Sequence, residues 1–330
     1  MKINEIWNEL ESDNSLATGL LLRRYSADVI PNVFIALRHP EKQRCLALRL
    51  NVVEKPDLTS FSNLKDIRVE LRADDKQRDI FYLAILLLDT EHEEVFSVFC
   101  EDLVSEISAI SDEKKIVQEL LDRLERWRSL FDKASLSGLS PEEQRGLYGE
   151  LFFIRRWIDA SGNLQRCIKA WLGPEKQIRD FQLNDWGLEV KTTNGKNHQK
   201  IHISSERQLD TTTLSSLFLF HLSLEDQQQN GETLNHIVDD LMNRLLKDVT
   251  ALRDFKTKLI LAGYYKHHSP QYEANGYQIR NQSYYNVKDD FPRIEEADIR
   301  RGVGDVKYSI ILSECTAYAT NEITVFESIN

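Results

Sequence analysis

Three charged residues that could hold a metal ion and activate water lie within RDFQLNDWGLEVKTT, which runs from Arg179 to Thr193. If Asn184-Asp185 forms a two-residue turn, this segment folds as a hairpin in which Asp180 lies opposite Glu189. Side chains two positions apart on a strand share a face, so Lys191 lies on the same side as Glu189. The hairpin therefore predicts two carboxylates and one ammonium group in one place.

Opposed carboxylates in a hairpin need compensation, because like charges whose Cβ atoms lie about 5 Å apart destabilise a strand pair. A hard divalent cation such as Mg²⁺ (or Mn²⁺) compensates them, since it accepts one or two carboxylates and completes its shell with waters and phosphate oxygens. Such an ion lowers the pKa of water and stabilises charge on a phosphate. Lys191 could position or deprotonate that water, or offset the developing charge. The alternative is a hairpin whose charges simply face solvent.

A third carboxylate is predicted on a helix upstream. The residues Ser140-Pro141-Glu142-Glu143 combine a capping serine, a proline at the first helical position and an acid three residues after the cap. In the helix that follows, Glu150 lies near the centre of an apolar stripe formed by Leu147, Leu151, Ile154 and Ile158. A buried carboxylate needs a partner such as an arginine or a metal, so Glu150 is expected to face one unless it lies at the exposed edge of the stripe.

The elements around these residues alternate between strands and helices. The segments Val29–Arg38, Arg44–Val53 and Leu214–Leu224 have the composition of strands, and Ile80–Leu88 is apolar on both faces, as in a buried strand or helix segment. Further elements are expected as helices at Ser111–Phe131 and Leu234–Val249, and as strands at Lys200–Ser204 and Lys258–Tyr265. This order predicts a mixed α/β chain.

Four segments, GLYGELFFI, WLGPEKQIRDF, GLEVKTT and IHISSERQLD, together resemble the PD-(D/E)XK nuclease superfamily. More narrowly, these segments and YYNVKDDFPRI are similar to the uncharacterised bacterial proteins known as PD-(D/E)XK motif proteins. The resemblance implies an α/β (α+β) fold with a restriction-endonuclease-like core, in which helices flank a mixed central β-sheet.

The resemblance also assigns roles to residues. It implies that Asp180 and Glu189 are metal ligands, that Lys191 is the catalytic lysine, and that Glu150 is the helical acid, which could hold a second metal or its water. Gln208 matches a glutamine that follows the third strand and helps to position the lysine. Arg179 stands where the superfamily name has proline. Because that proline takes no part in the chemistry, its replacement by arginine is expected to have little effect on the site.

The implied function is a Mg²⁺- or Mn²⁺-dependent DNA endonuclease that hydrolyses phosphodiester bonds. Relatives of this kind are often encoded in phage-defence or restriction-like gene clusters beside ATPase or helicase-like partners, so the resemblance implies such a setting. The alternative is a non-catalytic or partner-activated module that binds DNA or a protein within a defence complex. The formal net charge of -11 favours a protein-facing surface over one that coats nucleic acid.

Length and composition indicate a two-domain globular protein. With 330 residues and 41% hydrophobic content, the chain is predicted to form an N-terminal mixed α/β domain of unknown role over 1–135 and a nuclease-like domain with a C-terminal elaboration over 136–330. The boundary falls in the small, polar stretch KASLSGLSPEE.

Several other classes of protein are disfavoured. The longest apolar run, Ile80–Leu88, is too short to cross a membrane, and the first residues lack the apolar core of a secretory signal. The four cysteines include no Cys-x-x-Cys pair, so a disulfide framework is not expected. A cytoplasmic location is expected instead. Phosphate-binding loops of ATPases and the Gly-x-Ser-x-Gly elbow of serine hydrolases are absent from the sequence.

Overall fold

The protein is described from a computed structural model that covers residues 3–13, 15–51, 56–61, 64, 66–74, 77, 79–134, 138–194, 200–228 and 230–330. The chain divides into two compact units, of which the first contains Met1–Ser137 and Tyr265–His267 and the second contains Gly138–Tyr264 and His268–Asn330. The domain boundary predicted at residue 135 lies outside the described residues. No helix in these ranges is long and apolar enough to span a bilayer.

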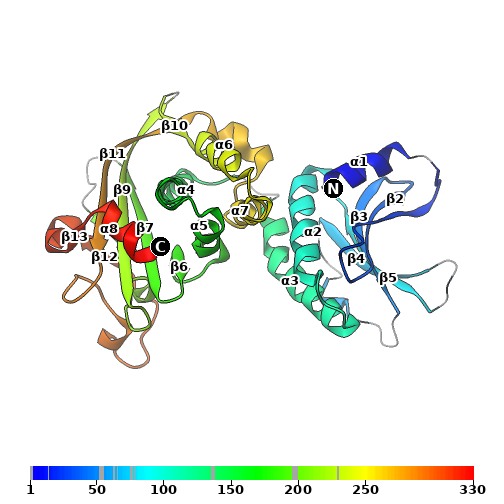
Figure 1. Cartoon of the computed structure of the whole chain (residues 1–330), viewed down its shortest axis with the longest axis horizontal. Coiled ribbons are helices and arrows are strands. Elements are labelled where there is room, and N and C mark those ends of the chain that lie inside the picture. The colour runs from blue at the N-terminus through cyan, green and yellow to red at the C-terminus, as the bar shows by residue number, and fades with distance from the viewer. Residues whose placement is uncertain are drawn as a thin grey trace. The chain divides into compact units, whose positions relative to one another are not determined.

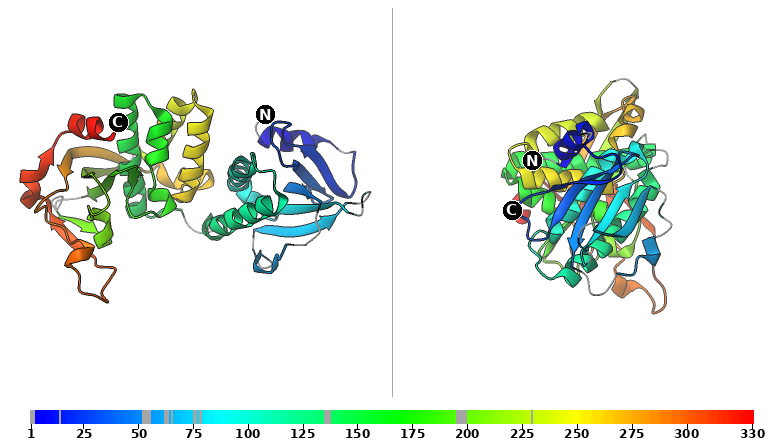
Figure 2. Two further views of the ribbon diagram at one scale, coloured as in Figure 1. Left: turned by 60° about the horizontal axis from the view of Figure 1, so that its bottom comes forward. Right: turned by 90° about the vertical axis from the view of Figure 1, so that its right-hand side faces the viewer.

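The first unit is built on a five-stranded antiparallel sheet in the order β1-β2-β3-β5-β4. The strands are β1 (Gly19–Arg24), β2 (Val33–His39), β3 (Gln43–Leu50), β4 (Ile67–Ala73) and β5 (Phe81–Leu87). The helices are α1 (Ile3–Ser12), α2 (Glu93–Ile107) and α3 (Glu113–Ala134). In Figures 1 and 2, α2 and α3 lie on the same side of the sheet.

The apolar run Ile80–Leu88, for which the sequence left strand and helix open, forms β5. This strand pairs with β3 on one side and β4 on the other, and the side chains from Leu83 to Leu87 are buried on both of its faces. A strand enclosed in this way needs apolar side chains throughout rather than alternation. The predicted helix Ser111–Phe131 is confirmed by α3.

The second unit contains a mixed sheet in the order β10-β11-β9-β7-β6, with β13 paired to β11. Strands β7 and β9 run parallel, and the other neighbours are antiparallel. The strands are β6 (Phe181–Leu183), β7 (Trp186–Asn194), β9 (Ser216–Gln228), β10 (Glu232–Thr233), β11 (Asn275–Asn286) and β13 (Ala319–Thr320).

Helices flank this curled sheet. They are α4 (Pro141–Ser161), α5 (Leu164–Ala170), α6 (Leu234–Leu245), α7 (Val249–Leu261) and α8 (Glu322–Ile329). Figure 1 shows α4 to α7 gathered on the concave side of the sheet. The predicted α/β (α+β) class, with a mixed central sheet flanked by helices, is therefore confirmed.

A small second layer covers the other face of the mixed sheet. The predicted strand Lys200–Ser204 forms β8 (Lys200–Ile203), but it pairs with β12 (Tyr308–Ile311) in a separate two-stranded sheet. Side chains of β9 alternate between the two layers: Phe218 and Phe220 pack in the main core, and Leu217 and Leu219 pack against the β8 layer. The 3-10 helix η4 (Glu206–Leu209), which carries Gln208, follows β8.

One predicted strand is wrong. Lys258–Tyr265 does not form a strand, because Lys258 to Leu261 are the last residues of helix α7. Asp248 caps the start of this helix by accepting a hydrogen bond from the backbone N–H of Ala251 at 3.0 Å. Ala251, Phe255 and Leu259 then recur at helical spacing and are buried. A short apolar run fits a buried strand or a buried helix end, and here the helical spacing of the apolar residues before it shows that it belongs to a helix.

Candidate metal centre

The predicted hairpin register is confirmed for the residues of β6, and the ladder ends before it reaches Asp180 and Glu189. In the β6–β7 pair, Leu183 lies opposite Trp186 and Phe181 opposite Leu188. Asn184 begins the turn at a φ of 55°, which this kind of hairpin requires and asparagine tolerates. The apolar side chains of the pair therefore point together into the core beneath α4.

Asp180 lies one residue before β6, so backbone and side-chain contacts hold it rather than the strand ladder. Its Oδ2 accepts a hydrogen bond from the backbone N–H of Val190 at 2.8 Å. Its backbone carbonyl accepts from the N–H groups of Leu172 and Gly173, at 2.7 and 3.0 Å. These three bonds fix the carboxylate against β7.

Glu189 and Lys191 form a close ion pair on β7. The Nζ atom of Lys191 lies 2.7 Å from Oε1 of Glu189, and the two side chains are 15% and 1% exposed. Oε2 of Glu189 is buried and accepts no hydrogen bond from the described part of the chain. Since a buried acceptor without a donor is costly, this oxygen is suited to bind a ligand.

Glu150 reaches the hairpin from α4. The helix begins at the predicted capping box, in which Ser140 and Glu143 bond reciprocally. At Gly149 the helix packs closely on β7, since an added Cβ there would lie 2.4 Å from Cγ2 of Thr192. The half-buried Glu150 carboxylate accepts a hydrogen bond from Nε1 of Trp171 at 2.6 Å. The acid thus faces inward, as its place on the stripe predicted, and its partner is an indole.

Gly173 leaves room between two of the carboxylates. An added Cβ at this position would lie 2.7 Å from Oε2 of Glu150 and 3.1 Å from Oδ1 of Asp180. Both oxygens therefore face the same small space, which any other side chain would fill.

The pKa values of the acids reflect their crowding. Burial raises the pKa of Glu189 to about 8, and the Asp180 charge adds to this while Lys191 opposes it. Burial and then the Asp180 charge raise the pKa of Glu150 well above its usual value, against the Trp171 hydrogen bond. Burial also raises the pKa of Asp180, although Lys191 opposes the change. The site thus holds more negative charge than one lysine offsets.

Gln208 lies next to the catalytic lysine expected from the resemblance. Its Oε1 accepts hydrogen bonds from Nζ of Lys191 at 3.3 Å and from the backbone N–H of Ser204 at 2.9 Å. With this contact, the structure brings the five predicted residues into one cluster: Glu150, Asp180, Glu189, Lys191 and Gln208.

Arg179 has a structural role that the sequence did not suggest. Its side chain is 5% exposed, and it donates to the carbonyls of Arg207 and Gln208, each at 3.0 Å, and to that of Asp210. It therefore ties the helix that carries Gln208 to the hairpin. Nothing in the sequence distinguishes it from a surface arginine, because its acceptors are main-chain groups that become neighbours only on folding.

The donor set at this cluster fits a hard divalent cation. Asp180, Glu189 and Glu150 supply carboxylate oxygens, the buried Oε2 of Glu189 has no donor among the described residues, and Gly173 keeps the space open. Among the described residues, the group whose ligand atoms all lie within 4.8 Å of one another is a different one, Asp66, Asp89 and His92 of the first unit. Lys191 engages one oxygen of Glu189, and Trp171 engages one oxygen of Glu150.

A family model described as "Putative PD-(D/E)XK family member, (DUF4420)" matches residues 3–313. This span includes the first unit as well as the cluster. No curated protein and no solved structure is significantly similar to the chain.

Proposed function

The chain belongs to the DUF4420 family of PD-(D/E)XK proteins, and from this premise we propose that it is a metal-dependent nuclease that hydrolyses DNA phosphodiester bonds. The observation that carries the proposal is the convergence of Glu150, Asp180, Glu189 and Lys191. In the described part of the chain, the buried Oε2 of Glu189 receives no hydrogen bond. A buried acidic group of this kind, with perturbed pKa values and an open space, is typical of a catalytic site.

The carboxylates of Asp180 and Glu189, with Glu150 as a third donor, would hold Mg²⁺ or Mn²⁺. When bound, the ion supplies positive charge at the scissile phosphate and lowers the pKa of water. Oxygen donors of this type suit both ions, so the cluster itself does not select between them.

Lys191 is best suited to act as a charged donor. Burial opposes protonation, but the Glu189 and Asp180 charges raise the pKa of Lys191 above its usual value. The ammonium form therefore prevails near neutral pH, and it can donate to a phosphate oxygen or orient water rather than remove a proton. Glu189 and Gln208 hold this group in place from two sides.

Supercoiled plasmid incubated with purified protein and Mg²⁺ or Mn²⁺ tests the proposal. Nicking or degradation is expected from the wild type and from Lys169→Ala, which removes an exposed lysine of α5. Asp180→Asn and Lys191→Met are expected to lower the rate at least ~100-fold, as for loss of a group that stabilises the transition state. Activity that survives Lys191→Met would refute the assignment.

A second candidate function is a partner-activated or non-catalytic module of a phage-defence or restriction-like complex, beside an ATPase or helicase-like protein. The net charge of -11 supports this candidate, because a chain so acidic attracts DNA poorly by itself. Cleavage assays with and without the products of neighbouring genes separate the two. Activity only in their presence supports activation, and Asp180-dependent Mg²⁺ binding without cleavage in either case supports a binding module.

A further inference from the structure

A second group of metal-ligand residues lies at one end of the sheet in the first unit. Asp66 directly precedes β4, and Asp89 follows β5. These strands pair antiparallel with Ile67 opposite Leu87, so the start of β4 and the end of β5 lie side by side at the same end of the sheet. The 3-10 helix η2 (Thr90–His92) follows and turns His92 back toward Asp89. The backbone N–H of His92 donates to the carbonyl of Asp89 at 3.2 Å.

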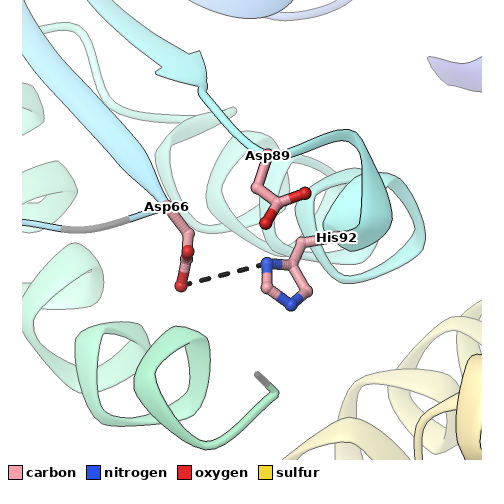
Figure 3. A group of neighbouring side chains, drawn as sticks. All are labelled: Asp66, Asp89 and His92. Atoms are coloured by element: carbon pink, nitrogen blue, oxygen red, sulfur yellow. Dashed lines mark ion pairs between the residues drawn. The ribbon is translucent and has the colours of Figure 1, made fainter.

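The three side chains converge in the way shown in Figure 3. Each offers a ligand atom, and all three atoms lie within 4.8 Å of one another. Nδ1 of His92 is turned toward Oδ2 of Asp66 at 3.9 Å, which is too long for a hydrogen bond. His92 is only 2% exposed, and its Nδ1 makes no hydrogen bond to any described residue. A buried ring nitrogen is thus aimed at two carboxylates without a bond to either.

The types of donor atom decide which ligand suits this arrangement. Asp66 is as buried as His92, and Asp89 is half-buried, so two carboxylates share a space of low polarity. A divalent cation is attracted by both carboxylates and is coordinated by the lone pair of a neutral imidazole, so it suits all three ligand atoms at once. Half-exposed Asp89 leaves one side of the group open to solvent.

From these observations we propose that Asp66, Asp89 and His92 bind a divalent first-row transition ion such as Zn²⁺. One nitrogen and two oxygens suit such an ion, whereas Mg²⁺ and Ca²⁺ prefer oxygen donors alone. Three protein ligands leave a coordination position for water. The ion links the start of β4 to the connection between β5 and α2, so it stabilises the first unit. This site is separate from the acidic cluster of the second unit.

Calorimetric titration of the full chain with ZnCl₂ tests the site, with the Asp180→Asn, Glu189→Gln variant as background to remove binding at the acidic cluster. In this background, Asp89→Asn and His92→Ala are expected to weaken Zn²⁺ binding at least ~100-fold, since changes outside the ligand shell alone cost 10–100-fold. His39→Ala removes a comparably buried histidine of the same unit and is expected to bind as the background does.

Thermal unfolding gives a readout that does not depend on activity. Zn²⁺ is expected to raise the melting temperature of the background and of His39→Ala, and not that of Asp89→Asn, which keeps the size of the side chain at a half-exposed position. The proposal is overturned if the background binds no Zn²⁺, or if Asp89→Asn and His92→Ala bind it as tightly as the background.

Discussion

Replacing Arg179 with methionine tests whether the residue before the motif aspartate supports the site. Methionine retains much of the side-chain volume but removes every donor of the guanidinium group. The carbonyls of Arg207, Gln208 and Asp210 then lose a buried donor. We expect η4 to loosen and Gln208 to withdraw from Lys191.

The size of the effect follows from these contacts. A hydrogen bond to a charged group contributes about 1.5–3 kcal/mol, and loss of three together is less than additive because the buried charge is removed as well. The free energy of unfolding should therefore fall by about 2–4 kcal/mol. If Gln208 positions Lys191, the rate of plasmid cleavage at saturating Mg²⁺ should also fall ~10–100-fold, a loss typical of disturbed positioning.

Arg166→Met is a matched control. Arg166 also donates to a backbone carbonyl of the second unit, that of Ile329, at 2.7 and 3.1 Å, but it has no contact with the cluster. Urea unfolding should show that both variants lose stability, while only Arg179→Met loses cleavage rate with its KM for DNA retained. Equal rates for the two variants at a temperature where both are folded would refute the positioning role.

Three further predictions concern the acidic cluster. Gly173→Ala should separate Glu150 from Asp180 and weaken Mg²⁺ binding at least ~10-fold by calorimetry, and unchanged affinity would contradict the shared space. Because the pKa of Glu189 is about 8 in the folded chain and near 4.5 when unfolded, the folded state binds the extra proton between these values. The free energy of unfolding without metal should therefore fall as pH rises from about 5 to 8, and Glu189→Gln, measured by urea unfolding at each pH, should flatten this slope. Trp171→Phe removes the hydrogen bond that lowers the pKa of Glu150, so Mg²⁺ binding should need a higher pH, and an unshifted pH dependence of binding in calorimetry would count against this role.

The local part of the candidate site could be predicted from sequence. A two-residue turn at Asn184-Asp185 set the register of the hairpin, and a slip by one residue would turn Phe181 and Leu188 to the polar face. The capping box placed the start of α4 in the same way, and helical periodicity then turned Glu150 inward. Both inferences needed only contacts between residues close in the chain.

The remainder depends on contacts between distant segments. The pairing of β8 with β12 joins residues about a hundred positions apart, and no turn signal specifies such a pair. The hydrogen bonds of Arg179 end on main-chain oxygens, which every residue carries, so side-chain types give no sign of them. At Lys258–Tyr265 the apolar run was uninformative, because a buried helix end and a buried strand have the same composition.

The close packing of α4 on β7 at Gly149 also determines which acid can serve on the helix. With no side chain at this position, the helix backbone approaches the sheet until Thr192 blocks it, and this separation sets the reach demanded of the next residue. Glutamate has one more methylene group than aspartate and spans the distance to the Trp171 indole. Aspartate at position 150 would stop short of Asp180, while a bulkier residue at 149 would lift even glutamate away. The two positions therefore act as one spacer, and a change at either is expected to be tolerated only with a compensating change at the other.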